Sequence, residues 1–283
     1  MSVSVSAFGS AAAPLVSALV HSTRTPKDAV ACVRSLLKQT IADRLEIILI
    51  DNHSEDDSIG IFRNTFGGHP LVRIVETKGN LGFGRGNNLG ARYATGEYLL
   101  IINPDTTLRA DALERMLEIL RHDPLIGILA PRLEFDDGTV RDSYRTFPTI
   151  LDIVIKRSGV FQRLFHRRLE RYLQRNVRTI DMRDTDWVAG GCIFLHMDLY
   201  RKLGGFDERF FLFFEDTDLC RRCWEAGQRV VYCPSIRAAD SKQRLSGGGF
   251  FSIFFRMTGR AHLVSAVKYF WKWRGKPLPR VPS

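Results

Sequence analysis

The 283-residue sequence has no run of eighteen apolar residues, and this absence excludes a helix that spans a lipid bilayer. We expect no secretory signal, because residues 1–14, MSVSVSAFGSAAAP, lack a basic start and a strong apolar centre, and we interpret them as a flexible lead. Internal repeats and low-complexity segments are absent too. With 45% apolar and 25% charged residues, the composition predicts a folded domain and excludes a disordered or fibrous chain.

Cysteine is scarce, and its odd count of five in a chain without a signal peptide predicts reduced thiols in a cytoplasmic protein. Cys220 and Cys223 form a Cys-x-x-Cys pair, one mark of a zinc or redox site. Only Cys233 lies nearby, so a structural zinc site lacks ligands. We therefore expect small core thiols instead.

Acidic residues are missing from residues 241–283, where nine Lys and Arg side chains give a charge of +9. Residues 141–178 hold ten basic and three acidic side chains, a further +7, although the whole chain carries only +10. Such localised positive charge suits an anionic partner. A nucleic-acid-binding protein is one alternative, but no known module of that class accompanies the charge, and we expect no nucleic acid partner.

Short apolar runs alternate with segments of helical spacing along most of the chain. Strands are expected at 15–21, 46–51, 71–75, 98–102, 126–131, 193–196 and 229–233, and helices at 26–40, 54–61, 111–122 and 216–226. This alternation predicts an α/β fold with a mostly parallel sheet flanked by helices, and a basic helical insertion at about 149–180. Because ligands bind at the carboxyl ends of such strands, Asp51 and Asp105 are candidate binding residues.

Two acidic motifs are candidates for catalysis or metal binding. Residues 213–218, FFEDTD, place three carboxyl groups directly after aromatic side chains, and a carboxyl beside apolar surface gains the raised pKa of a general base. The alternative is an ordinary acidic helix N-terminus. Residues 103–105, NPD, suit Mg²⁺ or Mn²⁺, or else form a simple turn.

The glycine-rich segment 79–88, GNLGFGRGNN, is a candidate loop for close approach of the backbone to a ligand. It does not match the dinucleotide fingerprint, because a G-x-G-x-x-G that starts at Gly82 ends on Asn87. The segment also lacks the first-strand context that this fingerprint requires.

The order of these motifs is more specific than any one of them. Asp51, the glycine-rich segment, NPD, WVAGG at 187–191 and GGFDERFFLFFEDTDLCRR at 204–222 follow one another along the chain. This order resembles the inverting nucleotide-sugar glycosyltransferases of family 2, in particular the bacterial rhamnosyltransferase-like group. The resemblance implies a GT-A-like, Rossmann-related domain over residues 15–246, followed by a basic amphipathic tail at 247–283.

The resemblance also implies a donor site, with Asp51 accepting from the pyrimidine ring N–H. The implied donor-binding residues are His21, Ser22, Thr23, Arg24, Asp51, Gly82, Gly84, Asn87, Asn103, Asp105, Lys242 and Arg244. The implied cofactor is Mg²⁺ or Mn²⁺, held by Asp105 and by Asp240, which stands where the family usually has a histidine. Lys242 and Arg244 would neutralise the departing diphosphate, or else belong to a solvated surface loop.

On the acceptor side, the resemblance implies that Asp216 is the catalytic base with Glu215 beside it, and that the acceptor is bordered by Trp187, Gly190 and Gly191. The implied reaction moves a sugar, such as rhamnose from dTDP-rhamnose, to a saccharide or polyprenyl-linked acceptor in cell-surface polysaccharide synthesis. Asn103 and Asp240 depart from the family pattern, so a catalytically silent glycan-binding relative is a second alternative.

The tail combines apolar positions at helical spacing with a basic face. The apolar positions are Phe250, Ile253, Phe254, Met257, Ala261, Val264, Val267 and Trp271, and the basic ones are Arg256, Arg260, Lys268 and Lys272. This pattern predicts a helix in an anionic membrane interface, and hence a peripheral protein on the inner face of the cell membrane. The alternative is a terminal helix that packs on the catalytic domain.

Overall fold

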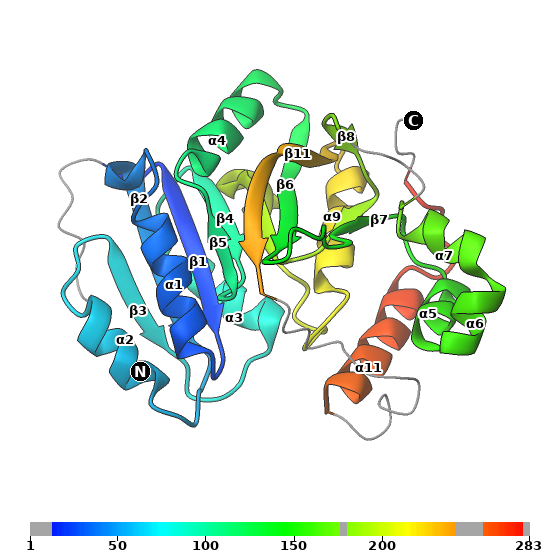
Figure 1. Cartoon of the computed structure of the whole chain (residues 1–283), viewed down its shortest axis with the longest axis horizontal. Coiled ribbons are helices and arrows are strands. Elements are labelled where there is room, and N and C mark those ends of the chain that lie inside the picture. The colour runs from blue at the N-terminus through cyan, green and yellow to red at the C-terminus, as the bar shows by residue number, and fades with distance from the viewer. Residues whose placement is uncertain (1–12, 176–179, 242–256, 280–283) are drawn as a thin grey trace.

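Nine strands of the computed structural model form one curled sheet, counted over the residues that it describes, 13–175, 180–241 and 257–279 (Figure 1). Their order is β3-β2-β1-β4-β10-β6-β11-β5, with β8 paired to β11. The strands are β1 Val16–Ser22, β2 Leu45–Asp51, β3 Val72–Glu76, β4 Tyr98–Ile102, β5 Thr106–Leu108, β6 Ile126–Phe135, β8 Arg183–Asp184, β10 Cys192–His196 and β11 Arg229–Asp240. Strands β7 Tyr144–Arg145 and β9 Trp187–Val188 form a separate antiparallel pair.

Helices cover both faces of this sheet. One face packs against α1 Pro26–Leu36, α2 Ser58–Phe66 and α4 Ala112–His122, and the other against α3 Phe83–Ala91, α8 Met197–Lys202 and α9 Glu215–Glu225. Strands β1, β2 and β4 are therefore buried at every position. Burial on both faces explains why these strands are almost continuously apolar in sequence. The predicted α/β fold is confirmed.

The sheet is parallel from β3 to β4 and mixed elsewhere. Strands β3, β2, β1 and β4 run parallel to one another, as do β6 and β11. Strand β10 lies between β4 and β6 and is antiparallel to both, and β5 and β8 are antiparallel to β11. The prediction of a mostly parallel sheet is confirmed with these exceptions.

Strands β6 and β11 are longer than the sequence predicts. Both continue past a proline, Pro131 in β6 and Pro234 in β11, and the pairing register shifts between Cys233 and Arg237. Such an irregularity lets a strand continue past a residue that has no backbone N–H. The extension matters for the site, because it carries Asp240 to the pairing position opposite Thr106 of β5.

The prediction of a loop over residues 82–86 is wrong, because Phe83 to Ala91 form helix α3. Its glycines give close packing: a Cβ on Gly86 would lie 2.2 Å from Nε2 of His21 in β1. Gly82, which precedes the helix, has φ of 76°, and a Cβ there would lie 2.1 Å from the carbonyl oxygen of Phe211. Only glycine fits that position without strain.

All five cysteines are free and buried, as predicted. Burial raises the pKa of Cys223 to about 12 and the pKa of Cys220 well above its ordinary value. Because the thiolate is the reactive and metal-binding form, these side chains are inert members of the core.

The basic insertion is helical, as predicted, and comprises α5 Ile150–Arg157, α6 Gly159–Leu164 and α7 His166–Tyr172. It lies beside the C-terminal helix α11 Met257–Lys272 at one end of the molecule (Figure 1). Among the described residues, no helix has the length and apolarity needed to cross a membrane. Residues 1–12, 242–256 and 280–283, which include Phe250, Ile253, Phe254 and Arg256 of the predicted tail, lie outside the described residues.

Helix α11 packs on the aromatic segment that precedes α9. Phe210 and Phe214 share a buried cluster with Ala266, Tyr269 and Trp273. The packed-helix alternative for the tail is therefore correct for one face of α11. The opposite face remains exposed, with Val264 at 50%, Val267 at 62% and Trp271 at 69% of their full accessible surface.

Candidate active site

The two acidic motifs meet at the dipeptide Gly190-Gly191, which joins β9 to β10. The Gly190 backbone N–H donates to Oδ2 of Asp216 at 3.0 Å. The carbonyl oxygen of Gly191 accepts from the Asn103 backbone N–H at 2.9 Å. Asp216 lies in the first turn of α9, whereas Asn103 follows β4. Residues far apart in the chain are thus brought to one dipeptide.

The two glycines leave room for the groups that gather around them. A Cβ on Gly190 would lie 3.7 Å from the Cβ of Asp216, which is ordinary contact. A Cβ on Gly191 would lie 2.9 Å from Cδ1 of Leu133 and 3.5 Å from Nη1 of Arg141. Because this dipeptide has no side chains, Asp216 and Arg141 can both lie close to its backbone.

Asp216 and Glu215 are adjacent in sequence but differ in environment. Burial raises the pKa of half-buried Asp216, while the backbone N–H groups of Gly190 and Thr217 and the charge of Arg145 oppose that rise. Burial raises the pKa of Glu215 well above its ordinary value, and the charge of Asp216 adds to the effect. Two carboxyl groups with separated pKa values divide the roles of acid and base. The smaller rise at Asp216, which its hydrogen bonds and Arg145 oppose, makes Asp216 the candidate base of the two.

The turn that presents these two acids is strained. Phe213 has φ of 69° and Phe214 has φ of 67°, a left-handed conformation that non-glycine residues rarely adopt. Helix α11 holds this turn: Ser265 Oγ donates to the carbonyl oxygen of Leu212 at 2.9 Å, and the ring of Phe214 lies 5.2 Å from that of Tyr269. Strain that neighbouring structure maintains is typical of functional sites.

Asp105 and Asp240 form a second acidic group on the other side of Gly191. Burial and the charge of Asp240 raise the pKa of Asp105 to about 6, although the charge of Arg141 opposes this rise. Ser241 Oγ donates to Oδ2 of Asp105 at 3.2 Å. The Asp240 side chain is fully buried and accepts a hydrogen bond from Nη1 of Arg141. A fixed guanidinium thus already faces this pair of carboxylates.

This acidic pair has the chemistry that a divalent cation needs. Carboxylate oxygens are the ligands that Mg²⁺ and Mn²⁺ prefer, and a cation between Asp105 and Asp240 would relieve the repulsion that raises the Asp105 pKa. Within the described part of the chain, no cluster of three or more His, Cys, Asp or Glu side chains is arranged to hold a metal. The remaining ligands would therefore come from a bound diphosphate and from water.

The predicted nucleotide end lies at the carboxyl edge of β1 and β2. Asp51 is buried, and its Oδ2 accepts from the Ser54 backbone N–H at 3.1 Å. Asn52, which the sequence analysis missed, donates to Oδ1 of Asn80 at 2.9 Å and accepts from the Leu81 backbone N–H at 2.9 Å. It also donates to Oγ1 of Thr23 at 3.3 Å. Asn52 therefore ties the first-strand loop to the glycine-rich segment.

Other predicted donor residues lie at the same edge with varied exposure. His21 is buried edge-on to Phe83, and burial lowers its pKa to about 4, so the ring is neutral at pH 7. Ser22 is buried within hydrogen-bonding distance of Thr25, while Arg24 is exposed and pairs with Glu55. The side chain of Asn87 donates to the Phe83 carbonyl oxygen inside α3, and Gly84 packs on Phe206. Their roles in donor binding remain predictions.

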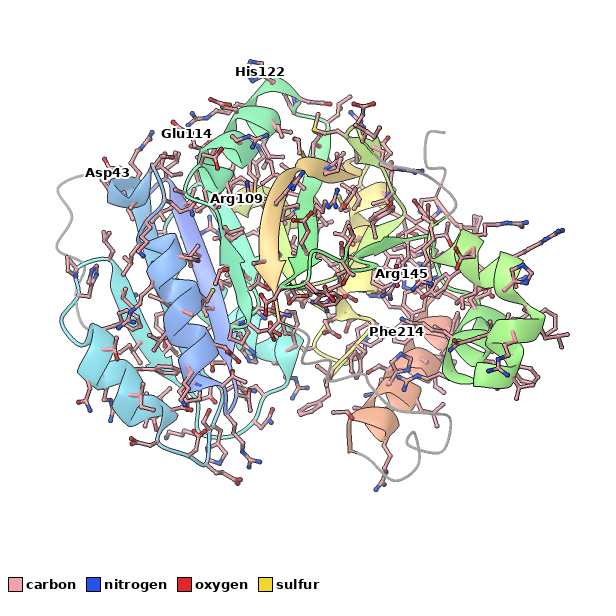
Figure 2. All side chains as sticks on the ribbon, viewed as in Figure 1. Asp43, Arg109, Glu114, His122, Arg145 and Phe214 are labelled. Carbon is pink, nitrogen blue, oxygen red and sulfur yellow. The ribbon has the colours of Figure 1, made fainter. Side chains whose placement is uncertain are left out.

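The sequence analysis also missed two arginines at the site, Arg141 and Arg145. They are the first two cations of the basic stretch 141–178, which was interpreted only as a surface charge. The Arg145 guanidinium carbon lies 5.0 Å from the ring centroid of Trp187, whose Nε1 donates to the Thr146 carbonyl oxygen at 2.8 Å. Figure 2 shows Arg145 between the sheet and α11, near Phe214. Lys242 and Arg244, the predicted diphosphate cations, lie outside the described residues.

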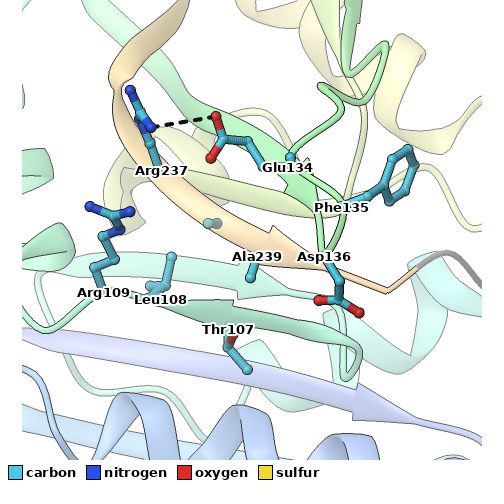
Figure 3. Close-up of a pocket in the computed structure, with 10 residues that line it drawn as sticks. Thr107, Leu108, Arg109, Glu134, Phe135, Asp136, Arg237 and Ala239 are labelled. Atoms are coloured by element: carbon cyan, nitrogen blue, oxygen red, sulfur yellow. Dashed lines mark ion pairs between the residues drawn. The ribbon is translucent and has the colours of Figure 1, made fainter.

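A pocket of about 340 Å³ lies beside the acidic pair, on β5, β6 and β11 (Figure 3). Its lining includes charges of both signs, and Arg237 lies 3.8 Å from Glu134. Arg237 and Ala239 alternate with Asp240 along β11, so their side chains point to the opposite face of the strand. The pocket is therefore separate from the surface around Gly190-Gly191.

The chain is similar to known glycosyltransferases in sequence. Residues 20–203 match the family model described as glycosyl transferase family 2. The chain is 28% identical to the N-acetylglucosaminyl-diphospho-decaprenol L-rhamnosyltransferase of Mycobacterium tuberculosis, over 72% of this chain and 68% of that protein. It is 26% identical to the rhamnosyltransferase WbbL of Escherichia coli K12, over 68% of this chain and 70% of that protein.

Solved structures share the fold at low sequence identity. A crystal structure of GalNAc-T7 with UDP, GalNAc and Mn²⁺ matches with a TM-score of 0.68 at 16% identity, and covers 94% of this chain and 49% of that one. The crystal structure of S. aureus TarS matches with a TM-score of 0.56 at 15% identity, over 80% of this chain and 36% of that one. This chain thus spans about half the length of the GalNAc-T7 chain. The fold is of the GT-A type.

Proposed function

Because the chain belongs to glycosyl transferase family 2, we propose that it transfers rhamnose from dTDP-rhamnose, or a similar sugar from a similar donor, with inversion of configuration. The acceptor in this proposal is a saccharide or polyprenyl-linked saccharide of a cell-surface polysaccharide. Glycosyltransferase activity in glycan synthesis follows from the family and from the rhamnosyltransferases that the chain resembles. The observation that supports the proposed mechanism is the shared dipeptide, since Gly190 contacts Asp216 while Gly191 lies beside Asn103 and beside Arg141, which pairs with Asp240.

Asp216 acts as the base in this mechanism. Its ionised carboxylate takes the proton of an acceptor hydroxyl as the hydroxyl oxygen forms a bond to the anomeric carbon of the donor sugar. The bond from that carbon to the diphosphate breaks in the same step, and its electron pair stays on the diphosphate oxygen. Attack from the face opposite the leaving group inverts the anomeric configuration. Burial raises the pKa of Glu215 and disfavours its carboxylate form, so in this mechanism Asp216 rather than Glu215 takes the proton.

The residues across Gly191 act on the leaving group. Mg²⁺ or Mn²⁺, when held by Asp105 and Asp240, supplies positive charge to the departing diphosphate. Arg141 already pairs with Asp240 and offers a planar set of donors suited to phosphate oxygens. Lys242 and Arg244 belong to the same proposal as further cations beside the diphosphate.

The outer face of α11 supports peripheral association with an anionic membrane, which on this proposal is the inner face of the cell membrane. Val264, Val267 and Trp271 are exposed there, and Lys268 lies on the same exposed side of the helix. An amphipathic helix with apolar and cationic side chains on its free face is suited to the headgroup region. A membrane-bound enzyme would meet a polyprenyl-linked acceptor where that lipid is located.

The test combines donor binding with transfer. Thermal unfolding of the purified protein is measured with a panel of nucleotide-diphosphate sugars, with and without Mg²⁺ or Mn²⁺. We expect dTDP-rhamnose or a close analogue to raise the unfolding temperature in a metal-dependent way, and the same donor to support transfer to a lipid-linked saccharide. A panel in which no nucleotide sugar binds or is consumed would contradict the proposal.

A further inference from the structure

The helical insertion has an outer surface that the catalytic proposal does not use. Three large apolar side chains of α6 and that of the residue after it, Val160, Phe161, Leu164 and Phe165, are 73%, 39%, 68% and 40% exposed. Their spacing of one, four and five places them on one side of the helix. We call these four residues the insertion face. An exposed apolar cluster of this kind marks a contact with a partner rather than ordinary surface.

The helical insertion that carries the insertion face is rich in positive charge. Residues 149–175 contain seven Lys and Arg side chains and two acidic ones. Of the acids, Asp152 is buried, caps α5 through Thr149 and binds Nε of Arg168 at 2.7 Å. The other, Glu170, lies 3.4 Å from Arg175. The outward charge of the insertion is therefore positive, which matches an anionic surface.

The insertion and α11 belong to one lobe of the molecule. Ile153 of α5 packs on the cluster formed by Phe214, Tyr269 and Trp273. Figure 1 shows α5, α6 and α11 together at the same end of the chain's fold, away from α1 and α2. The outward residues of α11 include Leu263, which is 45% exposed, besides those already named. Two helical elements of this lobe thus combine exposed apolar residues with cations.

The insertion is anchored to the predicted acceptor side of the site. The Thr146 backbone N–H donates to the Tyr172 carbonyl oxygen at 3.2 Å, and the carbonyl oxygen of Thr146 accepts from Nε1 of Trp187 at 2.8 Å. The Phe147 backbone N–H donates to Oδ2 of Asp186 at 2.6 Å. A surface bound by the insertion would therefore lie near the strand that leads to Gly190.

We propose that the insertion face docks into the headgroup layer of an anionic lipid bilayer, as a second membrane contact beside the outer face of α11. Apolar side chains enter the boundary of the acyl chains while the exposed side chains of Arg163 and Arg167 bind lipid phosphates. Two contacts fix the orientation of the lobe, whereas one helix alone leaves it free to pivot. The proposal rests on the proposed function only for the lipid-linked nature of the acceptor, because docking itself needs no catalysis.

The experiment measures partition of the full-length protein onto phosphatidylcholine vesicles with and without about one third phosphatidylglycerol. The double variant Val160→Ser/Leu164→Ser removes two exposed side chains of the insertion face, and we expect it to partition about tenfold more weakly onto the anionic vesicles. The matched control is Leu125→Ser, since Leu125 is 60% exposed between α4 and β6, outside the lobe. The control should partition like the parent protein.

Equal partition of the double variant and the parent would overturn the proposal. A loss of partition that occurs only with Val267→Ser/Trp271→Ser would then leave α11 as the membrane contact. A dimer, detected by light scattering, that the double variant dissociates would instead show that a second copy covers the face. Transfer to a water-soluble acceptor should stay unchanged in the double variant. A protein that binds vesicles but transfers no sugar would refute the proposed function and leave this inference intact.

Discussion

Replacing Asp216 by Asn tests the assignment of the base most directly. The amide oxygen of Asn can still accept the 3.0 Å hydrogen bond from the Gly190 backbone N–H, so the local backbone should keep its position. The amide cannot take a proton at neutral pH. Glu215 does not replace the lost base, because it packs toward α3, where a Cβ on Gly84 would lie 3.7 Å from the Glu215 Cβ. The variant therefore isolates the chemical step.

General base catalysis contributes typically 100- to 10,000-fold to a rate, and we expect kcat of Asp216→Asn to fall by about 1,000-fold. This loss corresponds to about 4 kcal/mol in the activation barrier. The assay follows transfer of labelled sugar to the acceptor, and donor binding and the unfolding temperature are measured on the same sample.

Glu215→Gln is the matched control. Because burial raises the pKa of Glu215 and disfavours its carboxylate form, an amide at this position should lower kcat by less than about tenfold. A normal kcat for Asp216→Asn, or a greater loss for Glu215→Gln, would refute the division of roles between the two carboxyl groups.

The remaining predictions concern pH, metal and stability. Activity should decline as the pH falls through the raised pKa of Asp216, and Arg145→Met should shift that decline to higher pH in a kcat–pH profile, whereas Arg145→Lys should not, because only the former removes the charge that lowers this pKa. Chelation of divalent cations should abolish transfer, and Asp105→Asn should weaken Mn²⁺ binding measured by electron paramagnetic resonance; full activity in excess chelator would reject the metal. Asp218→Asn should lower the free energy of unfolding by about 3 kcal/mol in urea titration, since this fully buried carboxylate is held by Lys, Arg and Trp donors. Burial lowers the pKa of His262 to about 3, so the folded state disfavours protonation of this ring. The contribution of the neutral ring to the free energy of unfolding is complete above pH 6.5 and is lost as the pH falls toward 3. His262→Phe should therefore reduce the acid sensitivity of thermal unfolding.

The sequence predicted the fold best where buried strands appear as short apolar runs that end in polar residues. Strands β1, β2 and β4 are mostly apolar because both faces of the sheet are covered, and Asp51 is a candidate from sequence because it ends such a strand. The continuation of β11 past Pro234 escaped prediction, because proline normally ends a central strand and the irregularity that admits it depends on the partner strand. The placement of Asp240 beside Asp105 follows from that continuation.

Two other features depend on contacts that a local pattern does not contain. The glycines at 82–86 were interpreted as a loop, but small residues also let a helix approach a strand closely, and His21 of β1 occupies the space that a side chain on Gly86 would need. Charge counts located the basic stretch without showing which cation turns inward. Arg141 does so because Asp240, 99 positions later, is buried within its reach.

The contacts between α11 and α9 have a consequence for the order in which parts of this protein become fixed during synthesis. Trp273 Nε1 donates to Oδ1 of Asp218 at 3.0 Å across 55 positions of the chain, and Lys272 binds the same carboxylate. A nascent polypeptide that has emerged only as far as β11 already contains Glu215 and Asp216, but it lacks Ser265 and Tyr269 of α11, which hold the strained turn before them. These contacts on the turn therefore form only after α11 has been synthesised.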